Sequence, residues 1–309
     1  MANEVLYSGL GDQRLAEVLS GFVLMSLADR TALQQHPAIL YVGDFAGRGS
    51  STIKIPQVGL DGYDLPSQMG EGVSVANTAL TDASTTISVA RYSKAYEASG
   101  LAKLTDSTGI IMDAAMTFAR DAVITQGVQL ASLIANQTDG FTATVGTSGV
   151  DLDLAVHLAG VTTLEIAKAA DGPLLALYHP RQWADLRDEF TLAVGGSVQY
   201  NAMLQSQGMM LGIGGKGNLL GTDIVTSSYV PTANAAADRA GAIFSRGAVV
   251  WGDASIAPED DPLQMIIAGK ILFEKDRSRR ADLTAYLQHY YLGVAFGINA
   301  RGVSVITDA

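Results

Sequence analysis

A glycine-rich segment in the second half of the chain has the spacing of a nucleotide-binding loop. Gly212, Gly214 and Gly217 fit the pattern G-x-G-x-x-G, in which backbone amides approach a pyrophosphate at the start of a helix. That site needs a strand before the glycines and a helix after them, but only a short apolar run precedes them and no helical pattern follows. Lys216 is followed by Gly, not by Ser or Thr, so a P-loop is excluded. We therefore expect a flexible loop over Gly208–Gly221.

The four histidines could supply acid–base chemistry or bind a metal. His36, His157, His179 and His289 show no metal-ligand spacing, and no H-E-x-x-H motif occurs. A Ser–His–Asp set stays open because its members are distant in sequence, although the chain has no G-x-S-x-G elbow. His179 precedes Pro180, and we expect it to order the end of a strand. With no cysteine in the chain, thiolate nucleophiles and Cys-bound metals are excluded. The sequence therefore predicts no catalytic, cofactor-binding or metal-binding residues.

Two short charged runs complete the candidates for chemistry. Glu259–Asp261 is a run of three carboxylates between Pro258 and Pro262, which we interpret as a solvated turn and not as a metal site. Arg277–Arg280 is the densest basic cluster. Aspartates flank it on both sides, so a solvated hairpin turn is one interpretation and an electrostatic contact is the other.

The composition favours a protein that associates with itself. The chain has 309 residues, of which 48% are apolar and 17% charged, and 33 are glycine. Low charge with much Ala, Gly, Ser and Thr is typical of a protein that buries a large surface against its own copies. The net charge of −11 argues against a general nucleic-acid binder, which needs a basic face.

Neither a signal peptide nor a membrane span is expected. The N-terminal residues lack a basic region followed by an apolar stretch. The longest apolar runs, such as Val18–Leu27, are broken by Ser and Gly and fall short of the roughly 20 residues that span a bilayer. We expect synthesis in the cytoplasm and no membrane partner.

The first half of the chain predicts extended elements. Leu10–Ala32 has the periodicity of an amphipathic helix, which packs either on its own core or on a neighbour. Ser51–Val58 and Thr85–Tyr92 alternate as strands, the first expected to end at Pro56 as an edge strand. A long polar connection separates them, and such connections are rare unless they bind something, so we expect it to lie on a neighbouring subunit. Thr105–Asn136 predicts a spine helix of roughly 45 Å at 1.5 Å per residue.

The second half predicts an α/β region followed by long strands. Two helices are expected, over Asp151–Ala169 and over Pro180–Phe190, where proline occupies the first turn. The expected strands are Pro173–Tyr178, Thr222–Ser227, Gly241–Ser245, Ala248–Trp251, Leu263–Glu274, Leu283–Val294 and Gly302–Thr307.

Three local matches, taken in this order, resemble a known family. Thr52–Pro56 leads through an acidic loop and back through Thr86–Val89; Tyr178–Leu186 makes a strand-to-helix step; and Gly217–Pro231 makes a loop and strand. With the long helix between them, this order resembles the major capsid protein of tailed bacteriophages, the Hong Kong 97 fold, over almost the whole chain.

The resemblance implies an α+β fold in five parts. These are an N-terminal arm with a helix (1–47), an extended β-hairpin loop (48–97), a spine helix with the start of a peripheral β domain (98–149), an axial α/β domain (150–262) and return strands of the peripheral domain (263–309).

The resemblance also implies a structural role in the virion, without catalysis. The subunit would self-assemble into pentamers and hexamers of an icosahedral shell that encloses double-stranded DNA without sequence-specific binding. Its other expected partners are a separate scaffolding protein, a portal and a decoration protein. Arg277–Arg280 would then face packaged DNA or the acidic loop of a neighbour.

Two features differ from relatives within the family. The best-known member cross-links its subunits through a loop lysine and a neighbour's asparagine. Here the loop from Gln57 to Ala90 contains no lysine, and Lys54 and Lys94 lie at its base, so we predict no covalent cross-link of that type. The chain also begins about ten residues before its first expected helix. Any scaffold is therefore expected to be a separate protein, or a segment already removed.

Two alternatives remain at this point. Within the same fold, the chain could be an encapsulin, a bacterial shell that holds a cargo enzyme. In another class, it could be an α/β enzyme that uses the Gly208–Gly221 loop as a lid or cofactor clamp.

Overall fold

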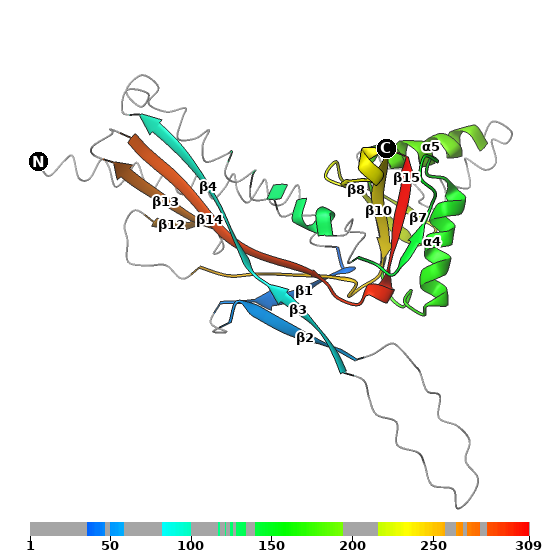
Figure 1. The fold of residues 1–309 in the computed structure, drawn as a ribbon, viewed down its shortest axis with the longest axis horizontal. Helices are drawn as coiled ribbons and strands as arrows, with labels where there is room; N and C mark the ends of the chain where they lie inside the picture. The colour runs from blue at the N-terminus through cyan, green and yellow to red at the C-terminus, as the bar shows by residue number, and fades with distance from the viewer. Residues whose placement is uncertain are drawn as a thin grey trace, which may run out of the picture.

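The chain forms two large β-sheets, a separate two-stranded hairpin and helices that cover one sheet (Figure 1). The computed structural model describes residues 36–46, 50–58, 82–99, 117, 121, 124–125, 128–133, 140–193, 216–256, 264–267, 271–278 and 283–308. Within these ranges the structure has the expected mixture of helices and strands. No helix among them is long and apolar enough to cross a membrane.

The six-stranded sheet is elongated and centres on one long strand, β14 (Figure 1). β14 pairs antiparallel with β13 and β4 along most of its length and with β11 at its C-terminal end, while β1 pairs parallel with β11. The members of this sheet are β1 (Ile39–Asp44), β4 (Ala90–Ser99), β11 (Val249–Asp253), β12 (Gln264–Ile267), β13 (Ile271–Ser278) and β14 (Leu283–Phe296).

The seven-stranded sheet is an α/β unit with the order β5-β15-β10-β6-β8-β7, and β9 pairs with β10. Helix α4 (Leu154–Ile166) packs on β15, β5 and β10, and α5 (Pro180–Ala193) packs on β6. The strands are β5 (Ala143–Val145), β6 (Leu174–Tyr178), β7 (Lys216–Leu219), β8 (Thr222–Thr226), β9 (Thr232–Ala233), β10 (Asp238–Phe244) and β15 (Gly302–Asp308). Two short 3₁₀ turns, Asn234–Ala236 and Asn299–Arg301, precede β10 and β15.

Most strands match the sequence predictions, but the following segments differ. Leu263–Glu274 is not one strand: β12 and β13 are antiparallel partners, so the chain turns back after Ile267 and resumes at Ile271. Lys216–Leu219 is not loop, because these residues pair with β8 as β7. The expected break at Pro56 is also wrong, because β2 continues through it to Val58, and an edge strand tolerates the missing amide.

The last strand, β15, lies in a different sheet from the one expected. It pairs with β10 and β5 in the seven-stranded sheet, not with the strands that precede it in the chain. Conversely, β11 follows β10 closely in sequence but joins the six-stranded sheet. The chain therefore crosses between the two sheets in both directions, which ties them into one body.

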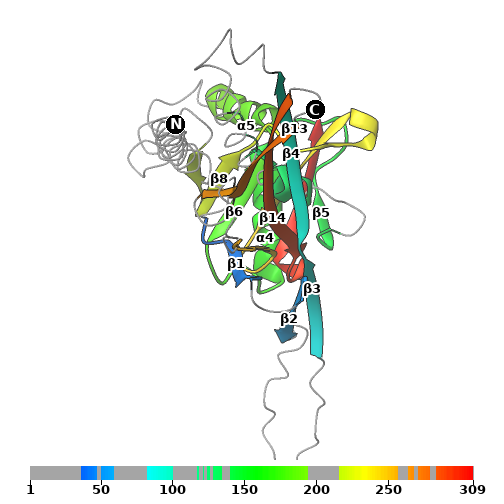
Figure 2. The same cartoon turned by 90° about the vertical axis from the view of Figure 1, so that its left-hand side faces the viewer.

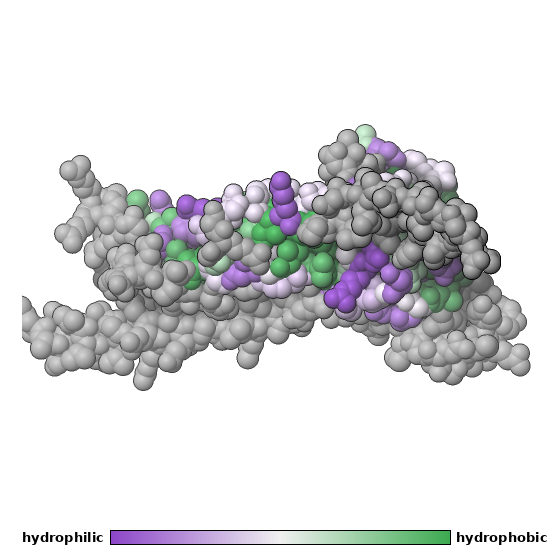
Figure 3. Space-filling model, turned by 90° about the horizontal axis from the view of Figure 1, so that it is seen from below, coloured by the Kyte–Doolittle hydropathy of each residue, from purple (hydrophilic) through white to green (hydrophobic). Residues whose placement is uncertain are grey.

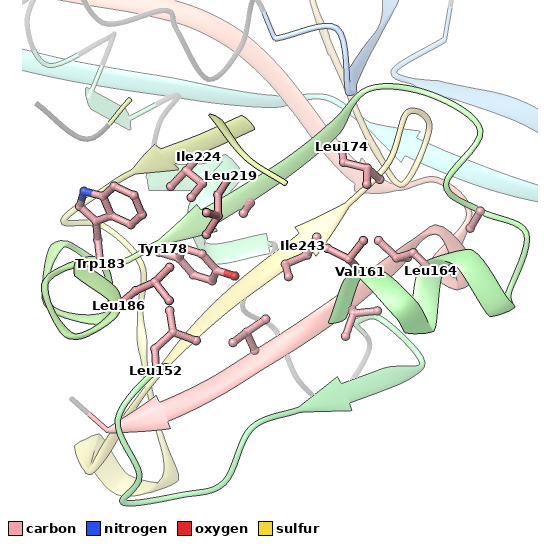
Figure 4. Packing of buried hydrophobic residues seen from close by; sticks show 14 residues of the cluster. Leu152, Val161, Leu164, Leu174, Tyr178, Trp183, Leu186, Leu219, Ile224 and Ile243 are labelled. Carbon is pink, nitrogen blue, oxygen red and sulfur yellow. The ribbon is translucent and has the colours of Figure 1, made fainter. Parts of the chain in front are cut away.

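Among the described residues, three apolar cores hold these layers together. The first joins the two sheets and includes Leu130 and Ala131 from a helical segment, Leu177 and Phe244 from the seven-stranded sheet, and Val249. The second lies between the seven-stranded sheet and its helices (Figure 4). The members labelled there are Leu152, Val161, Leu164, Leu174, Tyr178, Trp183, Leu186, Leu219, Ile224 and Ile243.

The hairpin projects away from both sheets (Figures 1 and 2). Its strands, β2 (Thr52–Val58) and β3 (Asp82–Ser88), pair antiparallel from Thr52 with Ser88 to Val58 with Asp82. The first of them is the predicted strand Ser51–Val58. The predicted strand Thr85–Tyr92 is divided at Val89: its first part belongs to β3, and its last part belongs to β4 in the six-stranded sheet. The connection between β2 and β3 lies outside the described residues, as does the predicted helix Leu10–Ala32. Of the predicted helix Thr105–Asn136, the described residues 117, 121, 124–125 and 128–133 are helical.

Candidate functional site

The base of the hairpin is anchored on one side and open to solvent on the other. Ile87 is fully buried with Phe45 and Val250, and Ile53 and Ile55 pack against this third core. The alternate side chains of both strands are exposed and mostly uncharged. They are Thr52, Lys54, Ser84, Thr86 and Ser88. The period of two along each strand thus gives the hairpin one apolar side for its own subunit and one polar side that is free for another molecule.

Close backbone approach fixes the hairpin to the long strand β14. Thr85 Oγ1 donates a hydrogen bond at 3.1 Å to the carbonyl of Gly297, directly after β14. Within the hairpin, Val89 N donates to Ser51 O at 2.9 Å and extends the pairing beyond Thr52 and Ser88. Gly293 of β14 faces the hairpin, and a Cβ there would lie 2.8 Å from the Ser88 carbonyl oxygen. The missing side chain therefore permits the contact.

The face of the six-stranded sheet beside the helical segment carries aromatic and charged contacts. Tyr92 of β4 stacks on Tyr290 of β14 with ring centroids 5.5 Å apart. Lys94, also on β4, forms an ion pair with Asp121 of the helical segment. Burial raises the pKa of both tyrosines, so they remain neutral. These contacts fix the helical segment to the sheet and involve no reactive arrangement.

On the opposite face, a polar network joins three strands around His289. This side chain is 7% exposed, and its Nδ1 lies 2.7 Å from Ser93 Oγ and 3.2 Å from Arg91 Nη2. Its Nε2 lies 3.4 Å from a carboxylate oxygen of Glu274. Because β4, β14 and β13 each contribute a group, the network fixes their register.

A second histidine links the segment before β1 to the other sheet. His36 Nδ1 accepts from the amide of Ala38 at 3.2 Å, so its Nε2 donates to Asp223 of β8, 3.0 Å away. Asn218 donates to the other oxygen of Asp223 at 2.8 Å. Burial alone would raise the pKa of Asp223, but the two hydrogen bonds have the larger combined effect and lower this pKa. We define this group as the His36 clasp.

The remaining histidines have structural partners. His179 lies between β6 and α5: its Nδ1 accepts from the amide of Arg181 at 3.2 Å, and its own amide donates to Gln182 Oε1 at 3.0 Å. Burial lowers its pKa, and the neighbouring arginines add to this effect. His179 thus orders a strand end, as predicted. His157 of α4 is buried, with Nδ1 2.8 Å from the hydroxyl of Tyr178.

These side chains do not converge on a reactive centre. The four histidines lie on different elements with separate partners, and no group of three His, Asp or Glu side chains suited to a metal occurs in the part of the chain that the structure describes. The strand Lys216–Leu219 occupies the position where the dinucleotide fingerprint requires a helix. Glu259–Asp261, Arg279–Arg280 and residues 208–215 lie outside the described residues.

Sequence reasoning missed the His36 clasp and the His289 network. Their partners are 187 and 196 residues apart in sequence, and no local pattern connects them. Seen from below, the described residues show hydrophilic and apolar groups side by side, with an apolar area near the middle of the long axis (Figure 3).

Two sheets in one body, with an anchored hairpin that projects from them, form an architecture that is found in viral shell subunits. The chain belongs to the phage capsid protein family, because the family's model matches residues 82–306. The resemblance to the Hong Kong 97 fold is thereby confirmed.

Solved structures with the same fold include both phage capsids and an encapsulin. A chain from Mycobacterium phage Che8 is 13% identical, with a TM-score of 0.57, 83% of this chain covered and 84% of that one. The capsid of Ralstonia phage GP4 is 11% identical, with a TM-score of 0.58 and coverage of 88% and 87%. The SrpI encapsulin complex from Synechococcus elongatus is 14% identical, with a TM-score of 0.56 and coverage of 90% and 88%. No match is found among curated protein sequences.

Proposed function

We propose that this chain is the major head subunit of a tailed phage and that it assembles into the pentamers and hexamers of an icosahedral shell. The proposal rests on how the base of the hairpin is attached, in a chain whose family match includes strands of both sheets. Its apolar side is packed against its own subunit at Ile87, and its polar side is open. An element anchored in this way projects its connection toward a neighbouring subunit.

The mechanism is distributed binding. Each subunit presents the same surfaces to its neighbours, and a closed shell multiplies individually weak contacts. The polar side of the hairpin suits this role, because it is soluble before assembly and its strand-edge and hydroxyl groups can form hydrogen bonds afterwards.

We assign the parts of the subunit as follows. The arm (1–47) and the extended loop (48–97) reach to neighbours, and a spine helix begins the segment 98–149. The six-stranded sheet is the peripheral domain and the seven-stranded sheet the axial domain. The axial domain therefore takes in β5 and β15, in addition to most of residues 150–262. The peripheral domain takes in β11, together with β1 from the end of the arm and β4 from the end of the extended loop.

The contents and partners follow from the charge and the family. The net charge of −11 suits a container whose wall does not adhere to the double-stranded DNA that it encloses. We propose a separate scaffolding protein, a portal and a decoration protein as further partners, the virion as the location, and no covalent cross-link through the lysine-free loop.

Electron microscopy of the purified full-length protein, expressed alone and with a scaffolding protein, tests the proposal. Uniform hollow shells, or rings of five and six subunits, are the expected result. A chain that remains a monomer or dimer under both conditions would contradict it. The encapsulin alternative is separated by the content of particles from infected or native cells. Nuclease-protected double-stranded DNA supports the phage head, and a single packaged protein without DNA supports the encapsulin.

A further inference from the structure

Strand β4 has one long edge that no other strand in the described part of the chain covers. Its other edge pairs with β14, from Ala90 opposite Leu292 to Ser99 opposite Leu283, without a bulge. The ten residues of β4 contain neither proline nor glycine. A long and regular edge of this kind is a template for pairing with another strand, because its outward amides and carbonyls lack ladder partners.

The side chains along this edge are exposed and carry charges of both signs. β4 runs to the end of the molecule that lies farthest from α4 and α5 (Figure 1). Lys94 is exposed on the face beside the helical segment, where it forms its ion pair with Asp121. The exposed residues on the opposite face, which carries the His289 network, are Arg91, Ser93, Ala95 and Glu97.

The two charges on the His289 face have no ion-pair partners of their own among the described residues. Arg91 donates to Ser93 Oγ at 3.0 Å and lies beside His289, but it contacts no carboxylate. Glu97 forms no ion pair with any described basic group. One strand edge therefore presents an arginine and a glutamate on the same face, both open to a charge from outside the subunit.

The spacing of these charges suits pairing with a second copy of the same strand. Two copies of β4 can pair antiparallel about a two-fold axis perpendicular to the sheet, which keeps every side chain on its own face and places one residue opposite its own copy. With Lys94 on the axis, Arg91 of each copy is directly opposite Glu97 of the other. With Ser93 or Ala95 on the axis instead, Arg91 is opposite an uncharged residue.

We infer that β4 pairs antiparallel with β4 of a second copy across a two-fold axis at Lys94, and that Arg91 and Glu97 of the two copies form two ion pairs. Opposite charges directly across an antiparallel pair stabilise it. The two copies of Lys94 that meet on the axis do not oppose the pairing, because Asp121 of each subunit neutralises its own lysine.

The inference rests on the proposed function and names one surface that joins its parts. Two-fold axes of an icosahedral shell relate subunits of neighbouring pentamers and hexamers, so this contact would connect rings and not close them. A second copy fits the edge better than a different protein does. In an antiparallel copy the order arginine, lysine, glutamate is reversed, so the same strand supplies the complementary charge at each position.

Charge reversal in the full-length protein tests the pairing under conditions where the wild type forms particles. Glu97→Arg places two arginines opposite each other, and we expect rings of five and six subunits but no closed shells by electron microscopy. Adding Arg91→Glu restores opposite charges and should restore shells. Glu165→Arg is the matched control at an exposed position of α4 and should leave shells normal. The melting temperature of the unassembled Glu97→Arg subunit should be unchanged, because this side chain is exposed.

Disulfide formation measures the register directly, and the chain has no native cysteine to interfere. Directly opposite residues of an antiparallel pair have Cα atoms about 4.5–5.5 Å apart, within the range that a disulfide bridges. Mild oxidation of Lys94→Cys particles should therefore give covalent dimers. Ala95→Cys particles should give monomers, because this position lies opposite Ser93 of the other copy. Dimers from Ala95→Cys and none from Lys94→Cys would overturn the inferred register.

The remaining outcomes separate this inference from the proposed function. Normal shells from Glu97→Arg would overturn the inference and leave the shell role intact. Shells without dimers from either cysteine variant would show that something other than β4 of a second copy covers the edge, which also overturns it. A wild type that forms no particles under any condition would contradict the proposed function, and this inference with it.

Discussion

At the scale of single residues, the histidines of this chain act as structural hydrogen-bonding groups with environments set by burial. His157 is the clearest case. Its ring is fully buried against the seven-stranded sheet, with one nitrogen at hydrogen-bonding distance from Tyr178. Burial penalises the charged imidazolium and lowers the pKa of His157 to about 4, although the backbone carbonyl of Leu219, an acceptor that favours the protonated ring, acts in the opposite direction. Burial likewise raises the pKa of Tyr178, so both partners of the pair are neutral at pH 7.

This environment predicts a pH dependence of subunit stability. The ordinary pKa of histidine is 6.5 and the folded value is about 4, so the unfolded state binds the proton first as the pH falls. The contribution of His157 is therefore complete above pH 6.5 and is lost between about pH 6.5 and pH 4, with a total of about 3 kcal/mol at most. In the variant His157→Asn, the amide replaces Nδ1 but cannot take up a proton. This variant should therefore lose this part of the pH dependence of the free energy of unfolding.

The measurement is denaturant unfolding of the unassembled wild type and the Asn variant between pH 4 and pH 7. The carboxylates titrate in both proteins, so the difference between their free energies of unfolding reports on His157 alone. The same pH dependence in both proteins would show that His157 does not carry the effect.

At the scale of elements, the attachment of the hairpin depends on Gly293 of β14. A Cβ at this position would lie 2.8 Å from the carbonyl oxygen of Ser88 and 2.9 Å from Cγ2 of Ile87. The backbone at Ser88 cannot move aside as the end of a flexible side chain can. Gly293→Ala should therefore lower the free energy of unfolding by about 1–3 kcal/mol. Gly172→Ala is the matched control, because a Cβ there meets only Arg246 Cβ at an ordinary 3.6 Å. Equal stabilities of the two variants in denaturant unfolding would show that the hairpin shifts without cost.

Local patterns predicted most elements, while the pairing between them required the structure. Alternation along Thr52–Val58 and a buried apolar run at Leu174–Tyr178 identified β2 and β6, because each strand's burial is encoded in its own residues. The turn between β12 and β13 was missed, since both sides of it are similar in apolar character. The assignment of β15 to the seven-stranded sheet was missed as well, because pairing with β10 is a property of distant residues. The His36 clasp belongs to the same class of long-range contact.

At the scale of the whole molecule, the two sheets behave as one body from which a hairpin extends. Strands cross between the sheets in both directions, and the first apolar core contains residues from both. The hairpin, in contrast, contacts the rest of the subunit only through its base in the described part of the chain (Figures 1 and 2). We therefore expect that a mutation in the hairpin can prevent contact with a neighbouring subunit without affecting the folding of the two sheets.

Shortening the hairpin tests this expectation. Because Val58 and Asp82 are directly opposite in the ladder, an Asn-Gly turn can replace residues 59–81 and close the two strands. We expect a subunit with an unchanged melting temperature, since the anchored side of the hairpin is retained, but no shells by electron microscopy, since the connection no longer reaches a neighbour. A Gly/Ser linker of native length at the same place is the control for reach: shells from it would show that length suffices, and their absence would assign the contact to the native side chains. Normal shells from the shortened variant would contradict the role of the hairpin in joining subunits.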